Sequence, residues 1–249
     1  MRSPIQSAMV FGASSAIATA FCRILARHGA RLHLIGRDPD ALRALAGDLE
    51  LRGAKFVAFS VADLSETGFH EQLVTECWES LGEPGLVLLA HGSLGEQTAC
   101  ETDWEQQRAQ IQTNFLSHLS LLTILANKFE QQRSGCLAAI SSVAADRGRA
   151  SNYIYGSAKA GLSCYLEGLR NRLAPAGVRV VDLRPGPVDS PMTAELPKGL
   201  LWSDPERIAR AMVRALAYRS GTVYLPFYWR PIMWIVKLMP DALIRKLGI

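Results

Sequence analysis

The chain has 249 residues, of which 49% are hydrophobic and 20% are charged. This length and composition fit one globular domain with a large core, and no internal repeat, low-complexity tract or interdomain linker indicates a second domain. The formal net charge of +4 is modest and the arginines are scattered without interleaved aromatic residues, so the sequence does not indicate a nucleic-acid-binding protein.

Short apolar runs along the chain predict strands. The runs are rich in Val, Ile, Leu and Ala and lack polar–apolar alternation, which is typical of parallel strands buried on both faces. They cover residues 7–12, 31–35, 55–60, 86–90, 136–142, 178–184 and 222–226.

Helical patterns separate the predicted strands. They cover residues 14–28, 39–52, 66–81, about 102–132 and 151–174, and a glycine follows each of the first three. Alternation of strands and helices predicts an α/β protein with a doubly wound parallel sheet of about seven strands and helices on both faces. We expect residues 1–249 to form this one domain.

A glycine turn follows the first predicted strand. It begins at Gly12 and leads through Ser14, Ser15 and Ile17 into the first predicted helix. Such a turn directs free backbone N–H groups and the positive end of the helix dipole toward a phosphate. The two serine hydroxyls add donors. The turn therefore predicts a site for the pyrophosphate of a dinucleotide.

The end of the second predicted strand bears on the choice of cofactor. NAD-binding folds usually carry an acid here for the ribose 2′-hydroxyl, whereas this chain has Gly36, which leaves space, followed by Arg37. A guanidinium suits a 2′-phosphate, so NADP(H) is favoured over NAD(H). The alternative is that Arg37 is a solvated loop residue.

A Ser–Tyr–Lys set provides the candidate catalytic residues. Tyr155 and Lys159 are four residues apart and share a face of the predicted helix, and Ser142 ends the buried strand upstream. A phenol has an unperturbed pKa of about 10, so it acts as an acid–base catalyst near neutrality only if a nearby cation stabilises the phenolate. Lys159 is the candidate cation. The alternative is an accidental spacing of two helical residues.

Together, the glycine turn and the Ser–Tyr–Lys set resemble the short-chain dehydrogenase/reductase family. Its pattern has Gly-x-x-x-Gly-x-Gly early in the chain and Ser, Tyr and Lys past the middle, and the resemblance covers nearly the whole sequence. It implies a Rossmann-type sheet and an NAD(P)H-dependent enzyme that reduces a ketone to a secondary alcohol, or the reverse. Ala16 and Ala18 replace two glycines of the pattern, so we expect an altered approach of the cofactor and not a lost site.

The resemblance also implies a mechanism. Ser142 and Tyr155 would hydrogen-bond the carbonyl oxygen, and Tyr155 would donate the proton. Lys159 would bind the nicotinamide ribose and lower the pKa of Tyr155. Asn114 matches the family's Asn that supports a water chain to this lysine, with helix capping or surface exposure as the alternative. The long helices at 102–132 and 151–174 would form the surfaces of a homodimer or homotetramer.

Further cofactor contacts follow from the resemblance. Asp63 matches an Asp that contacts adenine, although an Asp here also fits a helix cap. The family's Asn-Asn-Ala-Gly segment is replaced by Leu89-Ala90-His91-Gly92, in which we expect Ala90 and Gly92 to contact the cofactor and His91 to have no catalytic role. After the sixth strand, the family's Pro-Gly segment corresponds to Pro185, Gly186, Val188 and Ser190, where Ser190 replaces the usual Thr that contacts the nicotinamide amide.

The last third of the chain bears on the substrate. Residues 187–220 are predicted to form a substrate lid region and helix, with a capping-box pattern at Ser203 to Glu206. Residues 223–249 form an apolar extension whose prolines and charges exclude a membrane-spanning helix. Two alternatives are open for this extension. It packs on the sheet or on a partner subunit, or it makes peripheral membrane contact, with Trp229 and Trp234 among acyl chains and basic residues at headgroups; the basic residues are Arg230, Lys237, Arg245 and Lys246.

Three segments and this ending are similar to one branch of the family, the decaprenylphosphoryl 2-keto-ribose reductases. The segments are Ala90 to Gly95, Ser141 to Arg147 and Tyr155 to Leu162. The resemblance implies a lipid-linked keto-sugar or another hydrophobic substrate. Two other readings are open: a non-catalytic nucleotide-binding sensor or scaffold, motivated by the replaced glycines, and a peripheral membrane protein.

The five cysteines are widely spaced and contain no C-x-x-C pair, which indicates neither a disulfide framework nor a zinc site. We expect buried thiols in a reducing compartment and no metal. The first predicted strand begins within a few residues of the N-terminus, which leaves no room for a signal peptide. The expected location is therefore the cytoplasm, including the inner face of the membrane if the extension meets lipid.

Overall fold

The computed structural model describes the backbone of residues 5–247 and the side chains of residues 5–245, so the predicted headgroup contact of Lys246 lies outside the described side chains. Seven parallel strands form one sheet in the order β3-β2-β1-β4-β5-β6-β7. The strands are β1 (Ser7–Phe11), β2 (Arg31–Gly36), β3 (Phe56–Val61), β4 (Leu86–Leu89), β5 (Cys136–Ile140), β6 (Arg179–Pro185) and β7 (Gly221–Leu225). The predicted fold class and all seven predicted strands are confirmed, with ends that differ by no more than two residues.

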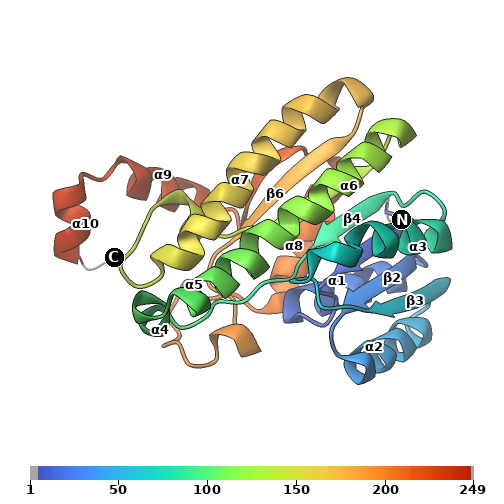
Figure 1. The fold of residues 1–249 in the computed structure, drawn as a ribbon, viewed down its shortest axis with the longest axis horizontal. Coiled ribbons are helices and arrows are strands. Elements are labelled where there is room, and N and C mark those ends of the chain that lie inside the picture. Colours follow the sequence, from blue (N-terminus) through green and yellow to red (C-terminus); the bar gives the residue numbers. More distant parts are fainter. Residues whose placement is uncertain (1–4, 248–249) are drawn as a thin grey trace.

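Helices cover both faces of the sheet (Figure 1). Successive strand residues point to opposite faces, so Ala8 and Val10 of β1 pack in one core while Met9 and Phe11 pack in the other. The first core lies under α1 (Ala16–Arg27), α2 (Pro39–Leu51) and α8 (Pro205–Tyr218). The second lies under α3 (His70–Leu81), α6 (Ser117–Gln132) and α7 (Tyr153–Leu173).

The strand order reverses between β1 and β4, and this reversal positions the site. Connections from these two strands leave to opposite sides of the sheet, which opens a crevice beyond their carboxyl ends. All the strands are parallel, so the segments after β1, β2, β3, β4, β5 and β6 reach the same edge of the sheet. The predicted site residues lie in these segments.

The predicted long helix at 102–132 is wrong in detail. Asp103 caps a new helix, because its carboxylate accepts a hydrogen bond from the Glu105 N–H at 2.9 Å. The chain therefore forms α4 (Gln97–Thr102), then α5 (Trp104–Ile111), and joins α6 through a π-helical turn at Gln112–Leu116. The wider turn holds one extra residue, which a sequence pattern of apolar positions does not reveal.

The predicted lid region leaves the sheet after β6 and returns to it as α8. The backbone N–H of Ser203 donates to Pro187 O at 3.1 Å, and Asp189 N–H donates to Ser203 O at 2.9 Å, so the two ends of the loop are joined. The capping-box prediction is wrong, because Asp204 and not Ser203 caps α8, accepting from the Arg207 N–H at 2.7 Å. Ser203 is buried at the base of the loop.

The C-terminal extension begins with β7 and continues as α9 (Trp229–Leu238) and α10 (Asp241–Leu247), which project at one end of the molecule (Figure 1). One face of α9 packs against Val143, in the turn after β5, through Trp229 and Met233. Trp229 is only 6% exposed, so of the two alternatives packing holds for this residue, whereas Trp234 is 65% exposed. No helix in residues 5–247 is long and apolar enough to cross a membrane.

Candidate active site

A crevice of about 520 Å³ lies beyond the carboxyl ends of the strands. Every residue that the sequence predicted as a catalytic or cofactor-binding residue lines it. These residues are Gly12, Ser14, Ser15, Ile17, Arg37, Asp63, Ala90, Gly92, Asn114, Ser142, Tyr155, Lys159, Pro185, Gly186, Val188 and Ser190. The fold thus collects at one place residues that are spread over most of the sequence.

The turn after β1 has a shape that requires glycine at its start. Gly12 has φ +75°, and a Cβ atom there would lie 2.5 Å from the backbone nitrogen of His91. The Gly12 N–H donates to Ile35 O at 2.8 Å, which ties the turn to the end of β2. The absence of a side chain lets the turn lie directly against the segment that follows β4.

The N-terminus of α1 opens toward the crevice. Ser15 caps the helix, with its Oγ accepting from the Ala18 N–H at 3.3 Å, and Ser14 and Ile17 lie beside it on the crevice wall. Ala16 lines the crevice, while Ala18 is fully buried in the core beneath α1. Of the two replaced glycines, only Ala16 therefore adds a methyl group to the crevice wall. Free N–H groups at a helix start, with a close-fitting backbone, suit a pyrophosphate.

Arg37 and Asp63 are exposed on the wall of the crevice that is formed by the ends of β2 and β3. The Asp63 carboxylate accepts from the Ser65 N–H at 2.9 Å and from Ser65 Oγ at 2.8 Å. These bonds, and to a smaller extent the charge of Arg37, lower the pKa of Asp63. Asp63 therefore organises its own turn and stays ionised beside Arg37, but it does not cap the helix that follows, whose N-cap is Glu66.

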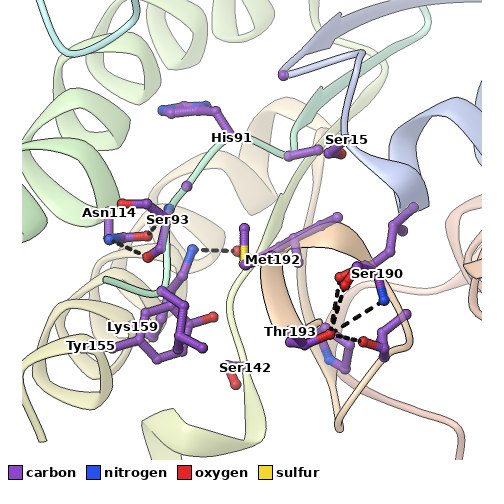
Figure 2. Close-up of a pocket in the computed structure, with 18 of the residues that line it drawn as sticks. Ser15, His91, Ser93, Asn114, Ser142, Tyr155, Lys159, Ser190, Met192 and Thr193 are labelled. Atoms are coloured by element: carbon purple, nitrogen blue, oxygen red, sulfur yellow. Dashed lines mark hydrogen bonds between the residues drawn. The ribbon is translucent and has the colours of Figure 1, made fainter. Parts of the chain in front are cut away.

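Ser142, Tyr155 and Lys159 lie close together (Figure 2). Ser142 caps the short helical turn after β5, accepting from the Ala144 N–H at 3.1 Å. Gly156 lets α7 pack tightly on this turn, since a Cβ there would lie 3.1 Å from Ala144 O. The close packing brings the phenol of Tyr155 within hydrogen-bonding reach of Ser142.

Lys159 is a buried cation beneath this pair. Its Nζ donates to Ile140 O at 3.0 Å and lies 5.7 Å from the centre of the Tyr155 ring. Burial lowers the pKa of Lys159 to about 8, with the carboxylate of Asp182 opposing this shift. Lys159 therefore loses its proton at a lower pH than a solvated lysine does.

The pKa of Tyr155 differs from the expectation. Its ring is half-buried, and burial raises the pKa to about 12, with the hydrogen bond to Ser142 opposing this shift. The predicted lowering of this pKa by Lys159 is not seen, and the Lys159 Nζ donates to Ile140 O. Tyr155 is thus a protonated phenol at neutral pH, which is the proton-donating form.

Asn114 lies in the π-helical turn and is fully buried. Its Nδ2 donates to Ser93 O at 2.9 Å and to Gln110 O at 3.0 Å, and its Oδ1 accepts from the Ser93 N–H at 3.1 Å. A Cβ at Gly92 would lie 2.7 Å from Asn114 Oδ1 and 3.4 Å from Lys159 Nζ. Asn114 therefore holds the segment after β4 beside Lys159. These hydrogen bonds explain why an amide side chain is buried at this position.

His91 is a packed residue beside the crevice. Its ring stacks on that of His118, with 3.8 Å between the ring centres, and its Nε2 is 2.8 Å from Ser117 Oγ. Burial lowers the pKa of both histidines well below the ordinary value. Both rings are therefore neutral at neutral pH.

The lid segment and α9 close the far side of the crevice. Thr193 Oγ1 donates to Val188 O at 2.6 Å and lies 3.3 Å from Ser190 Oγ (Figure 2). Trp229 packs over Gly186, where a Cβ would lie 2.0 Å from the indole Nε1. Glycine is required at this position because the indole occupies the space of a side chain.

Several residues of the crevice wall were not predicted as site residues. For Trp229, packing and membrane contact were both open, and Met192, Thr193 and Leu196 were placed only within the predicted lid region. Nothing in the local sequence marked Arg149 and Asn152. Their positions depend on how the lid, α7 and α9 pack together, which no periodic pattern encodes.

A comparison with protein families decides the assignment: the family described as short chain dehydrogenase matches residues 6–200. The chain belongs to the short-chain dehydrogenase/reductase family. It is an enzyme of the oxidoreductase class, and the family binds NAD(P) cofactors and acts on ketone or alcohol substrates.

Relatives of this short-chain dehydrogenase/reductase extend over almost its full length. An uncharacterized oxidoreductase of Mycobacterium tuberculosis is 36% identical over 239 residues, which are 96% of each chain. An uncharacterized oxidoreductase of Streptomyces coelicolor is 35% identical over 98% of this chain and 96% of its own. The solved structure of levodione reductase matches 93% of this chain and 99% of its own with a TM-score of 0.83 and 21% identity, which confirms the fold.

Proposed function

We propose that this protein is an NADPH-dependent reductase that converts a ketone into a secondary alcohol, or catalyses the reverse reaction. The observation that carries the proposal is the meeting of Ser142, Tyr155 and Lys159 in the same crevice as the glycine turn at Gly12. A phenol, a hydroxyl and an amine next to a phosphate-binding turn are the groups that hydride-transfer chemistry at a carbonyl requires.

In the proposed reaction, Ser142 and Tyr155 hydrogen-bond the carbonyl oxygen. Tyr155 donates its proton to that oxygen, which its raised pKa supports because the phenol is protonated at neutral pH. A bound nicotinamide supplies the hydride. Lys159, with a pKa of about 8, returns a proton to Tyr155, and Asn114 supports the water chain that supplies Lys159.

The proposed cofactor is NADPH in preference to NADH. Support comes from Arg37 on the crevice wall, with Gly36 beside it leaving space for a 2′-phosphate. The proposed cofactor contacts are Gly12, Ser14, Ser15, Ile17, Arg37, Asp63, Ala90, Gly92, Tyr155, Lys159, Pro185, Gly186, Val188 and Ser190. Titration calorimetry with each dinucleotide tests the preference, and tighter binding of NADH would overturn it.

Replacement of Tyr155 tests the catalytic assignment. We expect Tyr155→Phe to keep NADPH binding while turnover falls by roughly 10²- to 10⁴-fold, the usual contribution of a general acid. Tyr153→Phe is the matched control, because Tyr153 begins the same helix but does not line the crevice. NADPH consumption with a panel of keto-sugars, sterols and short ketones is the readout, and it also tests the sensor or scaffold alternative. Normal turnover by Tyr155→Phe would refute the assignment.

The proposed substrate is hydrophobic or lipid-linked, such as a keto-sugar on a polyprenyl phosphate. Support comes from the apolar side chains of Met192 and Leu196 on the lid side of the crevice, within the proposed lid region at residues 187–220. The exposed Leu200 and Leu201 extend this apolar surface outside it. A crevice that accepts only short ketones would count against a lipid-linked substrate.

A second proposed function is peripheral membrane contact by the extension at residues 223–249, at the cytoplasmic face. Support comes from apolar side chains that α9 leaves exposed, namely Trp234, Ile235 and Leu238, with Phe227 just before the helix. Arg230 and Lys237 lie on the same helix, where they suit anionic headgroups. We propose that assembly, in contrast, uses α6 and α7, as a homodimer or homotetramer.

Vesicle flotation tests the membrane proposal. We expect the full chain to float with vesicles that contain anionic lipid and the triple variant Trp234→Ser, Ile235→Ser, Leu238→Ser to stay in solution, because these side chains are exposed and leave the packed face of α9 intact. Truncation is a poorer test, since it also removes Trp229 from the crevice. Equal flotation of the full chain and the variant would contradict the proposal.

A further inference from the structure

Three polar atoms on one part of the crevice wall are buried and have no hydrogen-bond partner among the described residues. They are Arg149 Nε, Asn152 Oδ1 and Trp229 Nε1. Arg149 and Asn152 precede α7, and Trp229 begins α9. Buried polar atoms in folded proteins are nearly always paired. Three unpaired atoms in the crevice wall therefore indicate a place where the polar groups of a ligand form hydrogen bonds to them.

The charge of Arg149 also lacks a counter-ion. Within residues 5–245, its guanidinium forms no ion pair, and its one polar contact is from Nη2 to Met233 Sδ at 3.9 Å, a weak acceptor. The acid that acts on it is Asp146, which already binds Arg184 and accepts from Tyr224 Oη at 2.8 Å. Arg149 is thus a half-buried cation without its own anion, and burial lowers its pKa.

Arg149 and Trp229 flank the same end of the crevice. Met233, which contacts Arg149, lies one helical turn after Trp229 on α9. Both α9 residues pack with Val143, the neighbour of Ser142 in the chain. Arg149 and Trp229 therefore lie beside the turn that carries Ser142, with Trp229 Nε1 also against Gly186.

We propose that the substrate is a ketone that carries an anionic oxyacid group, and that Arg149 binds this group. The guanidinium supplies charge-assisted hydrogen bonds, and the indole N–H of Trp229 supplies a further donor. The carboxamide of Asn152 bonds the adjoining polar atoms of the substrate. This inference rests on the proposed function, because it takes the carbonyl to lie at Ser142 and Tyr155.

Binding of small anions tests the site directly. Titration with NADP⁺ comes first, and its failure in the wild type would count against the proposed function itself. The NADP⁺-saturated protein is then titrated with inorganic phosphate and with acetate, so that the glycine turn is already filled. We expect at least one anion to bind, and Arg149→Met to weaken that binding by roughly tenfold to hundredfold, as for a hydrogen bond to a charged group.

Three further variants separate the site from general effects. Arg149→Lys keeps the charge and is expected to retain part of the affinity, while Trp229→Phe keeps the ring and loses several-fold. Arg43→Met is the control for net charge, since Arg43 is exposed on α2 and pairs with Asp40. It should bind like the wild type. Absence of anion binding by the NADP⁺-loaded wild type, or equal binding by Arg149→Met, would overturn the proposal.

Turnover of paired ketones distinguishes the source of the anion. We expect the wild type to have a higher kcat/KM for hydroxyacetone phosphate than for hydroxyacetone, and Arg149→Met to lose this preference. The dodecyl diester of hydroxyacetone phosphate carries a phosphate anion on an alkyl chain. A higher kcat/KM for this diester than for hydroxyacetone phosphate indicates a lipid-linked phosphate as the natural group. No turnover of the diester indicates a free phosphate. Equal kcat/KM values for the charged and neutral ketones in the wild type would contradict the inference.

Discussion

At the scale of single residues, the site depends on Lys159, whose ammonium is buried and whose loss of hydration is only partly offset by its contacts. Lys159 is 3% exposed, and its Nζ has one hydrogen bond, to Ile140 O. Desolvation of an ammonium favours the neutral amine, and the charge of Asp182 restores only part of the loss. The cost is concentrated at the residue that the proposed reaction uses to pass a proton to Tyr155.

This cost predicts a pH-dependent stability. The pKa of Lys159 falls from an ordinary 10.5 to about 8 in the folded chain. Below pH 8 both states are protonated, whereas between pH 8 and 10.5 the unfolded chain binds the extra proton. The contribution of Lys159 to the free energy of unfolding therefore rises with pH through this window, by on the order of 3 kcal/mol.

Urea unfolding of the wild type and Lys159→Met between pH 7 and 10 measures the effect. The variant lacks the titrating amine, so the stability of the wild type relative to the variant should increase as the pH rises above 8. The comparison cancels the ionisation of buried thiols such as Cys77 and Cys136, which have raised pKa values in both chains. The exposed Lys55→Met gives the baseline for losing one charge. A pH-independent difference for Lys159→Met would contradict the prediction.

At the scale of elements, the π-helical turn at Gln112–Leu116 connects α5 to α6 and places Asn114 in the site. The turn inserts Asn114 against the backbone of Ser93, where its amide satisfies both the N–H and the C=O of that residue. An ordinary α-helical turn would direct this side chain elsewhere, and π turns are frequent at functional sites. The turn thus holds the loop after β4 next to Lys159.

We expect Asn114→Leu to lower the free energy of unfolding by about 2–4 kcal/mol, because it removes a fully buried amide and leaves the half-buried N–H and C=O of Ser93 without their partner. Gln112→Leu is the matched control in the same turn. It removes one half-buried hydrogen bond, from Nε2 to Ser65 O at 2.7 Å, and should cost about 0.5–1.5 kcal/mol. Denaturant unfolding and amide exchange at Ser93 are the readouts. Equal losses in the two variants, or unchanged exchange at Ser93, would be inconsistent with this role of Asn114.

At the scale of the whole molecule, a buried charge network connects the sheet to the C-terminal helices. Arg184 in β6 pairs with Asp182 at 2.8 Å and with Asp146 in the turn after β5. Tyr224 of β7 and Lys237 of α9 also reach Asp146, at 2.8 Å and 3.8 Å. The same network supports the wall of the crevice, because Ser142 and Asp146 bound the same short helical turn.

Removal of the Arg184 guanidinium should therefore strongly lower the free energy of unfolding. We expect Arg184→Met to cost about 3–5 kcal/mol of unfolding free energy, since among the described residues it leaves the buried Asp182 without an ion pair and leaves the buried Asp146 with only the more distant Lys237 as a cation. Arg23→Met removes a partly exposed pair with Asp48 at 2.8 Å and should cost about 0–1 kcal/mol. Denaturant unfolding of both variants measures the difference, and a loss at Arg184 no larger than at Arg23 would contradict the prediction.

The sequence by itself determined the strands, most helices and the sixteen catalytic and cofactor-binding candidates that lie on the crevice wall. Apolar runs and glycine positions report local backbone preference and burial, and the i, i+4 spacing of Tyr155 and Lys159 fixes their common face. Only the tertiary structure decided the π turn at Asn114, the inward position of Trp229, the raised pKa of Tyr155 and the lack of an ion pair for Arg149 among the described residues. Each of these features depends on contacts between segments that are distant in the chain. The local sequence around a residue is the same whether its side chain meets another side chain, a backbone carbonyl or solvent, so it does not reveal which contact forms.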